Sequence, residues 1–283
     1  MSREISTRVF LAGCPRSGTT LLQSLLAANS HVISFPETHF YERLVRGRLL
    51  TALGVPSRRA RPHWSEFLGE IGHPEMQPIL PKNAIFIRQF SKAFVQVLDT
   101  IALDQGMFVW LEKTPGHLRH IRTIEKLVDR TRFVHIVRNG EDTIASLNDL
   151  RNKQPRTWGR WFASLDHCIQ RWVTDVRISK EYASKENHRL VRYEQLVKNP
   201  RSVLENLCGF VGVPFEENML AGNTKSADRL ILEAEPWKKS VNEPIWTTGK
   251  RRFYEFLNEE ERQYIRSHIP EDLLDYFTPK SDK

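Results

Sequence analysis

The chain of 283 residues is 40% hydrophobic and 27% charged, so it can bury a sizeable core and is neither disordered nor of low complexity. Its formal net charge of +8 suits an anionic partner, whether a nucleotide, a nucleic acid, an acidic peptide or an acidic membrane surface. Three cysteines without a CxxC pair predict neither a disulfide framework nor a zinc site. The polar start and the lack of a ~20-residue apolar run predict a soluble, cytoplasmic protein without a membrane anchor.

The N-terminal part begins with a short apolar run at 9–12, which predicts a buried parallel strand. Apolar residues at helical spacing predict a helix over 20–28, and residues 32–35 predict a second strand. From 40 to 106 the pattern is helical but interrupted by prolines, with one long amphipathic helix expected over 84–103.

Strands and helices alternate through the rest of the chain. Strands are predicted over 107–111, 132–137 and 189–193, and helices over 118–127, 142–150, 158–182, 202–211 and 258–267. The helix over 158–182 would place Trp161 and Trp172 on one apolar face. This alternation predicts an α/β fold of three layers, in which helices flank a central parallel sheet and ligands bind at the carboxyl ends of the strands.

A glycine-rich loop, GCPRSGTT at 13–20, follows the first predicted strand and leads into the first helix. Its backbone amides and the positive helix end favour a phosphate. The two glycines are spaced as in the ATP-binding GxxxxGK[ST] loop, but Thr19 stands in place of the lysine that serves the β- and γ-phosphates. This exchange argues against a polyphosphate–Mg²⁺ substrate and suits a single phosphate, with Arg16 as its cation.

The segment PRSGTT at 15–20 resembles the 5′-phosphosulfate loop of sulfotransferases that use 3′-phosphoadenosine-5′-phosphosulfate (PAPS). The similarity is greatest to the protein-tyrosine sulfotransferases and related bacterial enzymes. The resemblance implies one P-loop-type domain over residues 1–283, PAPS as sulfuryl donor, 3′,5′-adenosine diphosphate as product, and no metal. The donor's 5′ end would be held by Arg16, Ser17, Gly18, Thr19 and Thr20.

Residues 133–146 resemble the family's 3′-phosphate segment, in which a strand ends in an arginine and a serine follows on the next helix. Arg138 lies at the carboxyl end of a predicted strand and Ser146 on the helix after it, so both can reach one phosphate. Arginine offers the fork geometry that a phosphate needs. A surface salt bridge is the alternative for Arg138.

Two further segments resemble cofactor-binding elements of the family. Tyr193, in RYEQL at 192–196, resembles a tyrosine that reaches the cofactor, although a packed tyrosine at a strand end is the alternative. Residues 225–252 resemble a tail that closes over the nucleotide, so Lys250 and Arg251 would complete the 3′-phosphate pocket.

The resemblance also assigns three catalytic residues. Glu37 follows the predicted second strand and matches the catalytic glutamate of the tyrosine sulfotransferase branch, which accepts the proton of the acceptor hydroxyl. Lys113 matches a lysine that stabilises the departing phosphate, and Ser240 matches a second helper at that oxygen. His39 is the rival base, although it matches no family position.

Two other functions stay open from the sequence. A P-loop kinase or nucleotide hydrolase would use Glu112, at a strand end, as its Mg²⁺-linked acid, but Thr19 and Arg138 argue against it. A nucleic-acid or polyanion binder fits the basic charge and the cluster RRAR at 58–61. Interleaved aromatic and basic residues of the RNA-recognition kind are missing, so no nucleic-acid partner is expected.

The acceptor is expected to be a hydroxyl-bearing compound. The helical segment 40–106 would shape its site, where arginines could receive an acidic peptide around a target tyrosine. The arginines expected after Glu37 are replaced by Thr38, His39 and Phe40, so a small molecule, a lipid or a sugar is as plausible an acceptor. The sequence predicts no oligomeric state.

Overall fold

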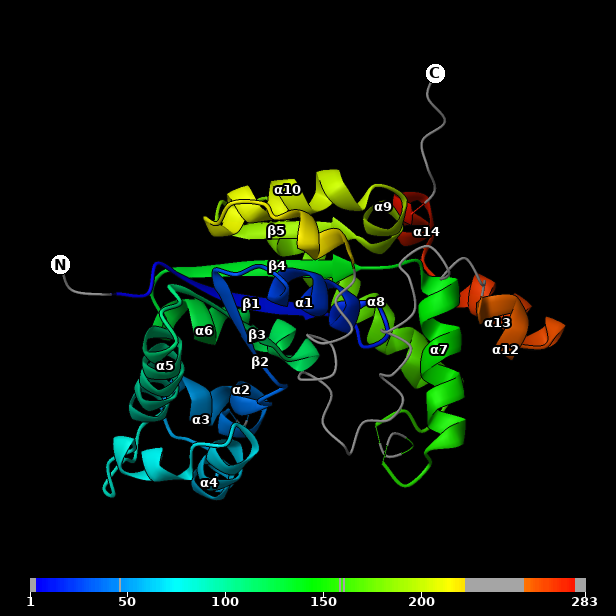
Figure 1. Ribbon diagram of the computed structural model, residues 1–283. Helices are drawn as coiled ribbons and strands as arrows, with labels where there is room; N and C mark the ends of the chain where they lie inside the picture. The colour runs from blue at the N-terminus through cyan, green and yellow to red at the C-terminus, as the bar shows by residue number, and fades with distance from the viewer. Residues whose placement is uncertain (1–3, 46, 158, 160, 222–251, 278–283) are drawn as a thin grey trace.

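The computed structural model describes residues 4–45, 47–157, 159, 161–221 and 252–277. A parallel five-stranded sheet in the order β2-β3-β1-β4-β5 forms its centre (Figure 1). The strands are β1 (Thr7–Gly13), β2 (Val32–Phe35), β3 (Val109–Lys113), β4 (Thr131–Val137) and β5 (His188–Arg192). The predicted α/β class with a helix-flanked parallel sheet is confirmed.

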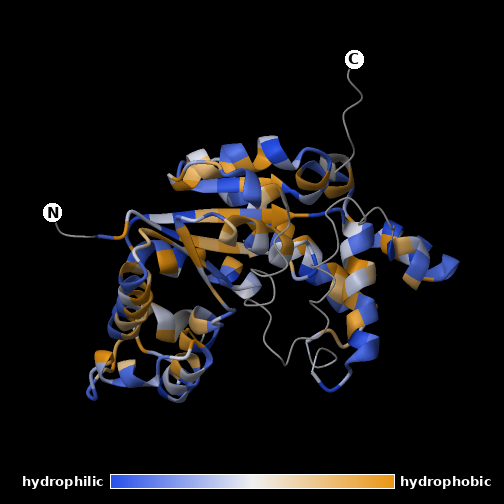
Figure 2. Cartoon of the chain, viewed as in Figure 1, coloured by the Kyte–Doolittle hydropathy of each residue, from blue (hydrophilic) through white to orange (hydrophobic). Residues whose placement is uncertain are grey.

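Helices cover both faces of the sheet because successive strand residues point to opposite sides. Along β1, Val9 and Leu11 belong to one apolar cluster, whereas Phe10 and Ala12 belong to another. The first cluster lies under α1 (Thr19–Ala27), α9 (Tyr193–Lys198) and α10 (Pro200–Val211). The second lies under α5 (Ile87–Asp104), η2 (Pro115–His120) and α6 (Ile121–Leu127). The strands between these layers are largely orange in Figure 2, in keeping with burial on both faces.

A third apolar cluster lies beyond the carboxyl ends of the central strands. It joins α7 (Gly140–Lys153) and α8 (Leu165–Tyr182) to the C-terminal helices α12 (Arg252–Phe256), α13 (Glu259–His268) and α14 (Glu271–Phe277). Trp172 and Phe253 are buried at its centre. This packing brings a segment far along the chain to the helix that follows β4.

The segment between β2 and β3 forms a separate group of helices at the lower left of Figure 1. It contains α2 (Phe40–Leu44), α3 (Arg48–Ala52), α4 (Ala60–Glu70), η1 (Pro74–Ile79) and α5. Aromatic rings hold the group together, and Phe40 stacks on Phe94 with ring centroids 4.1 Å apart. Within the described residues, no helix is both long and apolar enough to cross a lipid bilayer.

The predicted helix over 158–182 is wrong at its start. Helix α8 begins at Leu165, because the side chain of Ser164 caps it by accepting a hydrogen bond from the backbone N–H of His167 at 3.3 Å. Trp161 lies before this cap and is 75% exposed, whereas Trp172 is buried as expected. The other predicted elements match observed ones to within a few residues at their ends.

Candidate active site

The glycine-rich loop at 13–20, called the phosphate loop after the ligand expected for it, runs from the end of β1 to the start of α1 and needs both of its glycines. A Cβ atom on Gly13 would stand 2.3 Å from the carbonyl oxygen of Ile136 in β4. Gly18 has φ +94°, and a Cβ there would stand 2.4 Å from Cδ2 of Tyr193. The loop therefore lies directly against β4 and against the tyrosine that follows β5.

Arg16 leaves this loop in a left-handed conformation, with φ 72°. Its Nε donates a hydrogen bond to the hydroxyl of Ser146 on α7 at 3.0 Å. Arg252, the first residue of α12, donates to the same hydroxyl through Nη1 at 2.9 Å. Burial, followed by the positive charges of Arg252 and Arg138, lowers the pKa of Arg16 to about 10. The guanidinium groups of Arg16 and Arg252 thus meet on one serine, and that of Arg138 is close enough to act on Arg16 through its charge.

Arg138 follows the last residue of β4 and is only 6% exposed. Its guanidinium lies over the ring of Tyr193, 4.4 Å from the centroid, and contacts Asp142 at 3.3 Å. Asp142 also accepts a hydrogen bond from the backbone N–H of Phe253 at 3.2 Å, which holds α12, and with it Arg252, beside α7. Among the described residues, Nε of Arg138 and the hydroxyl of Ser17 are buried and have no hydrogen-bond partner.

The turn after Arg138 is held by the residue that follows Tyr193. Glu194 accepts hydrogen bonds from the backbone N–H and the side-chain amide of Asn139, at 2.9 and 3.0 Å. Asn139 in turn caps α7, because its side-chain oxygen accepts from the backbone N–H of Asp142 at 2.9 Å. These contacts fix the ends of β4 and β5 relative to one another.

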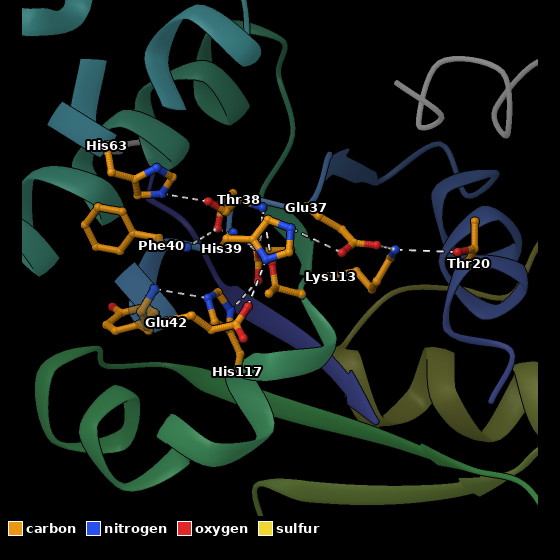
Figure 3. A network of polar contacts seen from close by, with 12 residues as sticks. Thr20, Glu37, Thr38, His39, Phe40, Glu42, His63, Lys113 and His117 are labelled. Atoms are coloured by element: carbon orange, nitrogen blue, oxygen red, sulfur yellow. Dashed lines mark hydrogen bonds and ion pairs between the residues drawn. The ribbon is translucent and has the colours of Figure 1, made fainter. Parts of the chain in front are cut away.

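Glu37 and Lys113 meet at the carboxyl ends of β2 and β3 (Figure 3). Lys113, whose side chain is 1% exposed, donates to Oε1 of Glu37 and lies 3.5 Å from the hydroxyl of Thr20 at the start of α1. Buried Gln23 on α1 fixes the end of β2, since its side-chain amide donates to the carbonyl oxygen of Phe35 at 2.9 Å. The pair therefore lies next to the phosphate loop.

Glu112, one residue before Lys113, is fully buried beneath the segment that carries Glu37. Its Oε1 accepts from the hydroxyls of Thr38 and Thr114, at 2.8 and 2.6 Å, and its Oε2 accepts from Nδ1 of His117 at 2.8 Å. Burial would raise the pKa of Glu112, but His117 and the donating hydroxyls hold it below its ordinary value. Glu112 is thus an ionised anchor for the turn after Glu37.

His39 completes this turn and has a left-handed backbone, with φ 50°. Its Nδ1 donates to Oε2 of Glu42 at 2.8 Å, and its Nε2 lies 3.6 Å from Oε2 of Glu37. Burial lowers the pKa of His39, but the hydrogen bond to Glu42 and the two carboxylates raise it above the ordinary value overall. The imidazole is therefore held between the two glutamates.

A cavity of about 1220 Å³ opens in front of Glu37. Its wall includes Pro15 of the phosphate loop, residues of α2, α4, η2 and α8, and residues of the segments before α4 and before α8. Five arginines line it against three glutamates, and the arginines are Arg43, Arg59, Arg119, Arg156 and Arg171. Arginines thus outnumber glutamates in the wall, and two of them, Arg119 and Arg171, pair with the buried Asp175.

A family model described as the sulfotransferase family matches residues 8–217, which include the phosphate loop and both strand ends described above. The chain belongs to the sulfotransferase family. The protein-tyrosine sulfotransferase of Drosophila melanogaster is 24% identical over 218 residues, covering 75% of this chain and 39% of that protein. Protein-tyrosine sulfotransferase 1 of Danio rerio is 23% identical over 216 residues, covering 75% of this chain and 55% of that protein. The chain thus spans less than two thirds of the length of these relatives.

Solved sulfotransferase structures share this fold. The sulfotransferase domain of the Synechococcus PCC 7002 olefin synthase matches with a TM-score of 0.57 at 24% identity, covering 97% of this chain and 94% of that domain. The sulfotransferase domain from the curacin biosynthetic pathway matches with a TM-score of 0.54 at 21% identity, covering 95% of this chain and all of that domain. The family model over residues 8–217 confirms the family resemblance drawn from the loop, and these structures agree with it in fold.

The sulfotransferase fold gathers most of the residues expected at the site into two neighbouring groups. Arg16, Arg138, Ser146 and Tyr193 form one group, and Glu37, Lys113 and Thr20 form the other. Arg16 was expected at the 5′ end of the donor, yet its left-handed backbone aims it at Ser146. Ser240, Lys250 and Arg251 lie outside the described residues.

Sequence reasoning did not single out Arg252 or the anchor Glu112. Arg252 lies in the basic run at 250–252, but a charge run does not tell which member turns inward. Glu112 was considered only as the acid of a kinase. Thr38 and Thr114, whose hydroxyls donate to Glu112, are the residues in the sequence that could have indicated a buried carboxylate at this position.

Proposed function

We propose that this protein transfers the sulfuryl group of PAPS to a hydroxyl of its acceptor. The observation that carries the proposal is the meeting of Arg16 and Arg252 on the hydroxyl of Ser146, with Arg138 close by. Buried like charges repel one another unless an anion lies between them. The 3′-phosphate distinguishes PAPS from ordinary nucleotides, and this cluster offers it guanidinium forks.

The groups around this cluster fit such a donor. The buried Nε of Arg138 and the buried hydroxyl of Ser17 have no partner among the described residues, so each can bind a ligand oxygen at no cost to an existing bond. Gly18 and the amides at the start of α1 lie between the arginine cluster and Lys113, where they suit the 5′-phosphate. PAPS would supply the sulfuryl group and a phosphate leaving group.

Among the residues of this chain, Glu37 and Lys113 would take part in the transfer reaction. Glu37 would accept the proton of the acceptor hydroxyl as that oxygen bonds to sulfur. Lys113, between Glu37 and Thr20, would stabilise the negative charge that develops on the departing phosphate oxygen. Both groups are held before the donor binds, so their positioning costs little at the moment of reaction.

Glu112 disfavours the kinase alternative. A Mg²⁺-linked acid needs a free carboxylate oxygen at the nucleotide. Both oxygens of Glu112 instead accept hydrogen bonds from Thr38, Thr114 and His117 in a fully buried position. Its role is structural support of the turn that carries Glu37.

The acceptor would enter the cavity in front of Glu37, and the helical segment 40–106 would shape its wall. Five arginines in that wall favour an acceptor that carries negative charge near the reacting hydroxyl. The tyrosine sulfotransferases among the relatives make a peptide tyrosine one such acceptor, beside charged small molecules, lipids and sugars.

Ligand-dependent thermal unfolding tests the donor site. We expect 3′,5′-adenosine diphosphate to raise the melting temperature far more than adenosine 5′-monophosphate, because only the former reaches the arginine cluster. Stabilisation by ATP–Mg²⁺ but not by 3′,5′-adenosine diphosphate would refute the proposal. Incubation with ³⁵S-labelled PAPS and host extract would then identify the labelled acceptor.

A further inference from the structure

An exposed apolar patch lies on the helical segment between β2 and β3, away from the arginine cluster. It consists of Leu50, Leu53, Val55, Ile85 and Phe86. Leu53 and Ile85 are each 63% exposed, and the other three are 39–51% exposed. Large apolar side chains that stand this far into water in a contiguous group indicate an interaction surface.

Backbone contacts make these residues one surface. The N–H of Val55 donates to the carbonyl oxygen of Leu50 at 2.9 Å, which closes the turn after α3. The N–H of Ile87 donates to the carbonyl oxygen of Gly54 at 2.8 Å, which joins that turn to the start of α5. The patch is therefore a rigid pair of adjoining turns rather than a set of scattered side chains.

The two stretches that carry the patch are basic and contain no acid at all. Residues 45–65 hold five arginines and residues 76–98 hold two lysines and one arginine, without a single aspartate or glutamate in either stretch. Arg58, Lys82 and Arg88 are exposed there. The partner that binds this surface must therefore present both apolar groups and negative charge.

We propose that this patch docks the protein on the surface of an anionic lipid bilayer. Apolar side chains flanked by arginine and lysine suit the boundary between acyl chains and acidic headgroups. A peptide helix would need a groove lined by apolar side chains, yet Leu53 and Ile85 protrude and only Phe86 of the patch lines the neighbouring cavity. The protruding shape thus favours a lipid surface over an acidic peptide.

The neighbouring cavity links this surface to the acceptor side of the molecule. It has a volume of about 1350 Å³ and is lined by apolar side chains such as Phe86 and Ile121 and by polar ones. Its charged residues are Arg88, Arg119, Arg122 and Lys126 against Glu181. Val45 and Arg119 line both this cavity and the one in front of Glu37. A bilayer on the patch would therefore lie beside the acceptor cavity.

Vesicle co-sedimentation without donor or acceptor tests the docking separately from the transfer reaction. We expect the protein to pellet with vesicles of phosphatidylcholine and phosphatidylglycerol, to stay in solution with phosphatidylcholine alone, and to be released by salt. The double variant Leu53→Ser/Ile85→Ser should bind at least tenfold more weakly, since burial of one such side chain is worth roughly tenfold in affinity. Arg58→Glu should weaken binding about fivefold or more.

Two control variants separate docking from general surface effects. Phe108→Ser removes an apolar side chain that lies outside the patch and is 41% exposed. Lys198→Glu reverses an exposed charge on α9. Both variants should bind vesicles as the wild type does. Unchanged melting temperatures would verify that the variants fold. Equal binding to neutral and anionic vesicles, full binding by the double variant, or self-association in buffer that the double variant loses would each overturn the proposal.

Discussion

Replacing Arg252 by alanine should affect the free and the nucleotide-bound protein in opposite directions. Arg16 and Arg252 both donate to the hydroxyl of Ser146, at 3.0 and 2.9 Å. Their donor nitrogens therefore lie no more than about 6 Å apart. Two unit charges about 6 Å apart repel by about 3 kcal/mol at an effective dielectric of 20, and by less where water reaches them. Loss of Arg252 removes this repulsion, so the free variant should be as stable as the wild type or slightly more stable.

The bound state should respond in the other direction. A guanidinium that binds a phosphate contributes about 1.5–3 kcal/mol, so Arg252→Ala should weaken 3′,5′-adenosine diphosphate roughly ten- to 150-fold. Adenosine 5′-monophosphate, which lacks the 3′-phosphate, should bind the variant and the wild type alike. Isothermal titration with both nucleotides, together with urea unfolding of the free proteins, measures each effect.

Arg266→Ala is the matched control, because Arg266 belongs to the same C-terminal helices but pairs with Glu141 at 2.7 Å. It should leave the affinity for both nucleotides unchanged. Equal weakening of both nucleotides by Arg252→Ala would refute the assignment of Arg252 to the 3′-phosphate. A free Arg252→Ala protein that unfolds at a clearly lower urea concentration than the wild type would show that Arg252 supports the fold rather than the ligand.

Four other substitutions or conditions test separate parts of the site and the fold. Glu37→Gln should lower turnover by about 10²–10⁴-fold with unchanged binding of 3′,5′-adenosine diphosphate in titration calorimetry, and normal turnover would exclude Glu37 as the base. His39→Gln should lower turnover far less than Glu37→Gln does, because His39 lies 3.6 Å from Glu37 and would only orient it. A loss of turnover as large as that of Glu37→Gln, together with the disappearance of the acid limb of the pH–rate profile, would make His39 the base. Gly18→Ala should destabilise the protein by about 1–3 kcal/mol in urea unfolding, because φ is +94° and the new Cβ would meet the ring of Tyr193; an unchanged midpoint would contradict the loop geometry. Burial, followed by the neighbouring His188, lowers the pKa of His135 to about 3, so the folded state resists protonation of this imidazole. The free energy of unfolding should therefore be full above pH ~6.5 and fall by about 2 kcal/mol by pH 5. His135→Gln should reduce this loss.

The sheet and the phosphate loop could be predicted because local sequence determines them. Short apolar runs bounded by glycine or polar residues mark the strands, and the glycine spacing at 13–20 marks the loop. The start of α8 could not be found from periodicity, since apolar spacing continues back to Trp161. Only the cap at Ser164 separates the exposed Trp161 from the helix, and a serine is too common to identify as a cap from sequence alone.

The composition of the arginine cluster depends on contacts between distant segments, which the sequence does not encode locally. Arg138 and Ser146 are close along the chain, so strand-to-helix geometry alone predicts that both lie at the same edge of the sheet. Arg252 reaches Ser146 only because Asp142 holds the backbone of Phe253, a contact across more than a hundred residues. Arg16 reaches it only through a left-handed backbone that an arginine rarely adopts.

Two carboxylates that are not themselves expected to bind a ligand hold the candidate site residues in place. Glu112 binds the hydroxyl of Thr38 and so ties the end of β3 to the turn that carries Glu37. Glu194 binds the backbone and the side chain of Asn139 and so ties the start of α9 to the turn after β4. Glu112 thus joins the carboxyl ends of β2 and β3, and Glu194 joins those of β4 and β5, while β1 pairs with β3 and β4 between them. The precision of the site therefore depends on these two carboxylates as much as on the residues that would meet the donor.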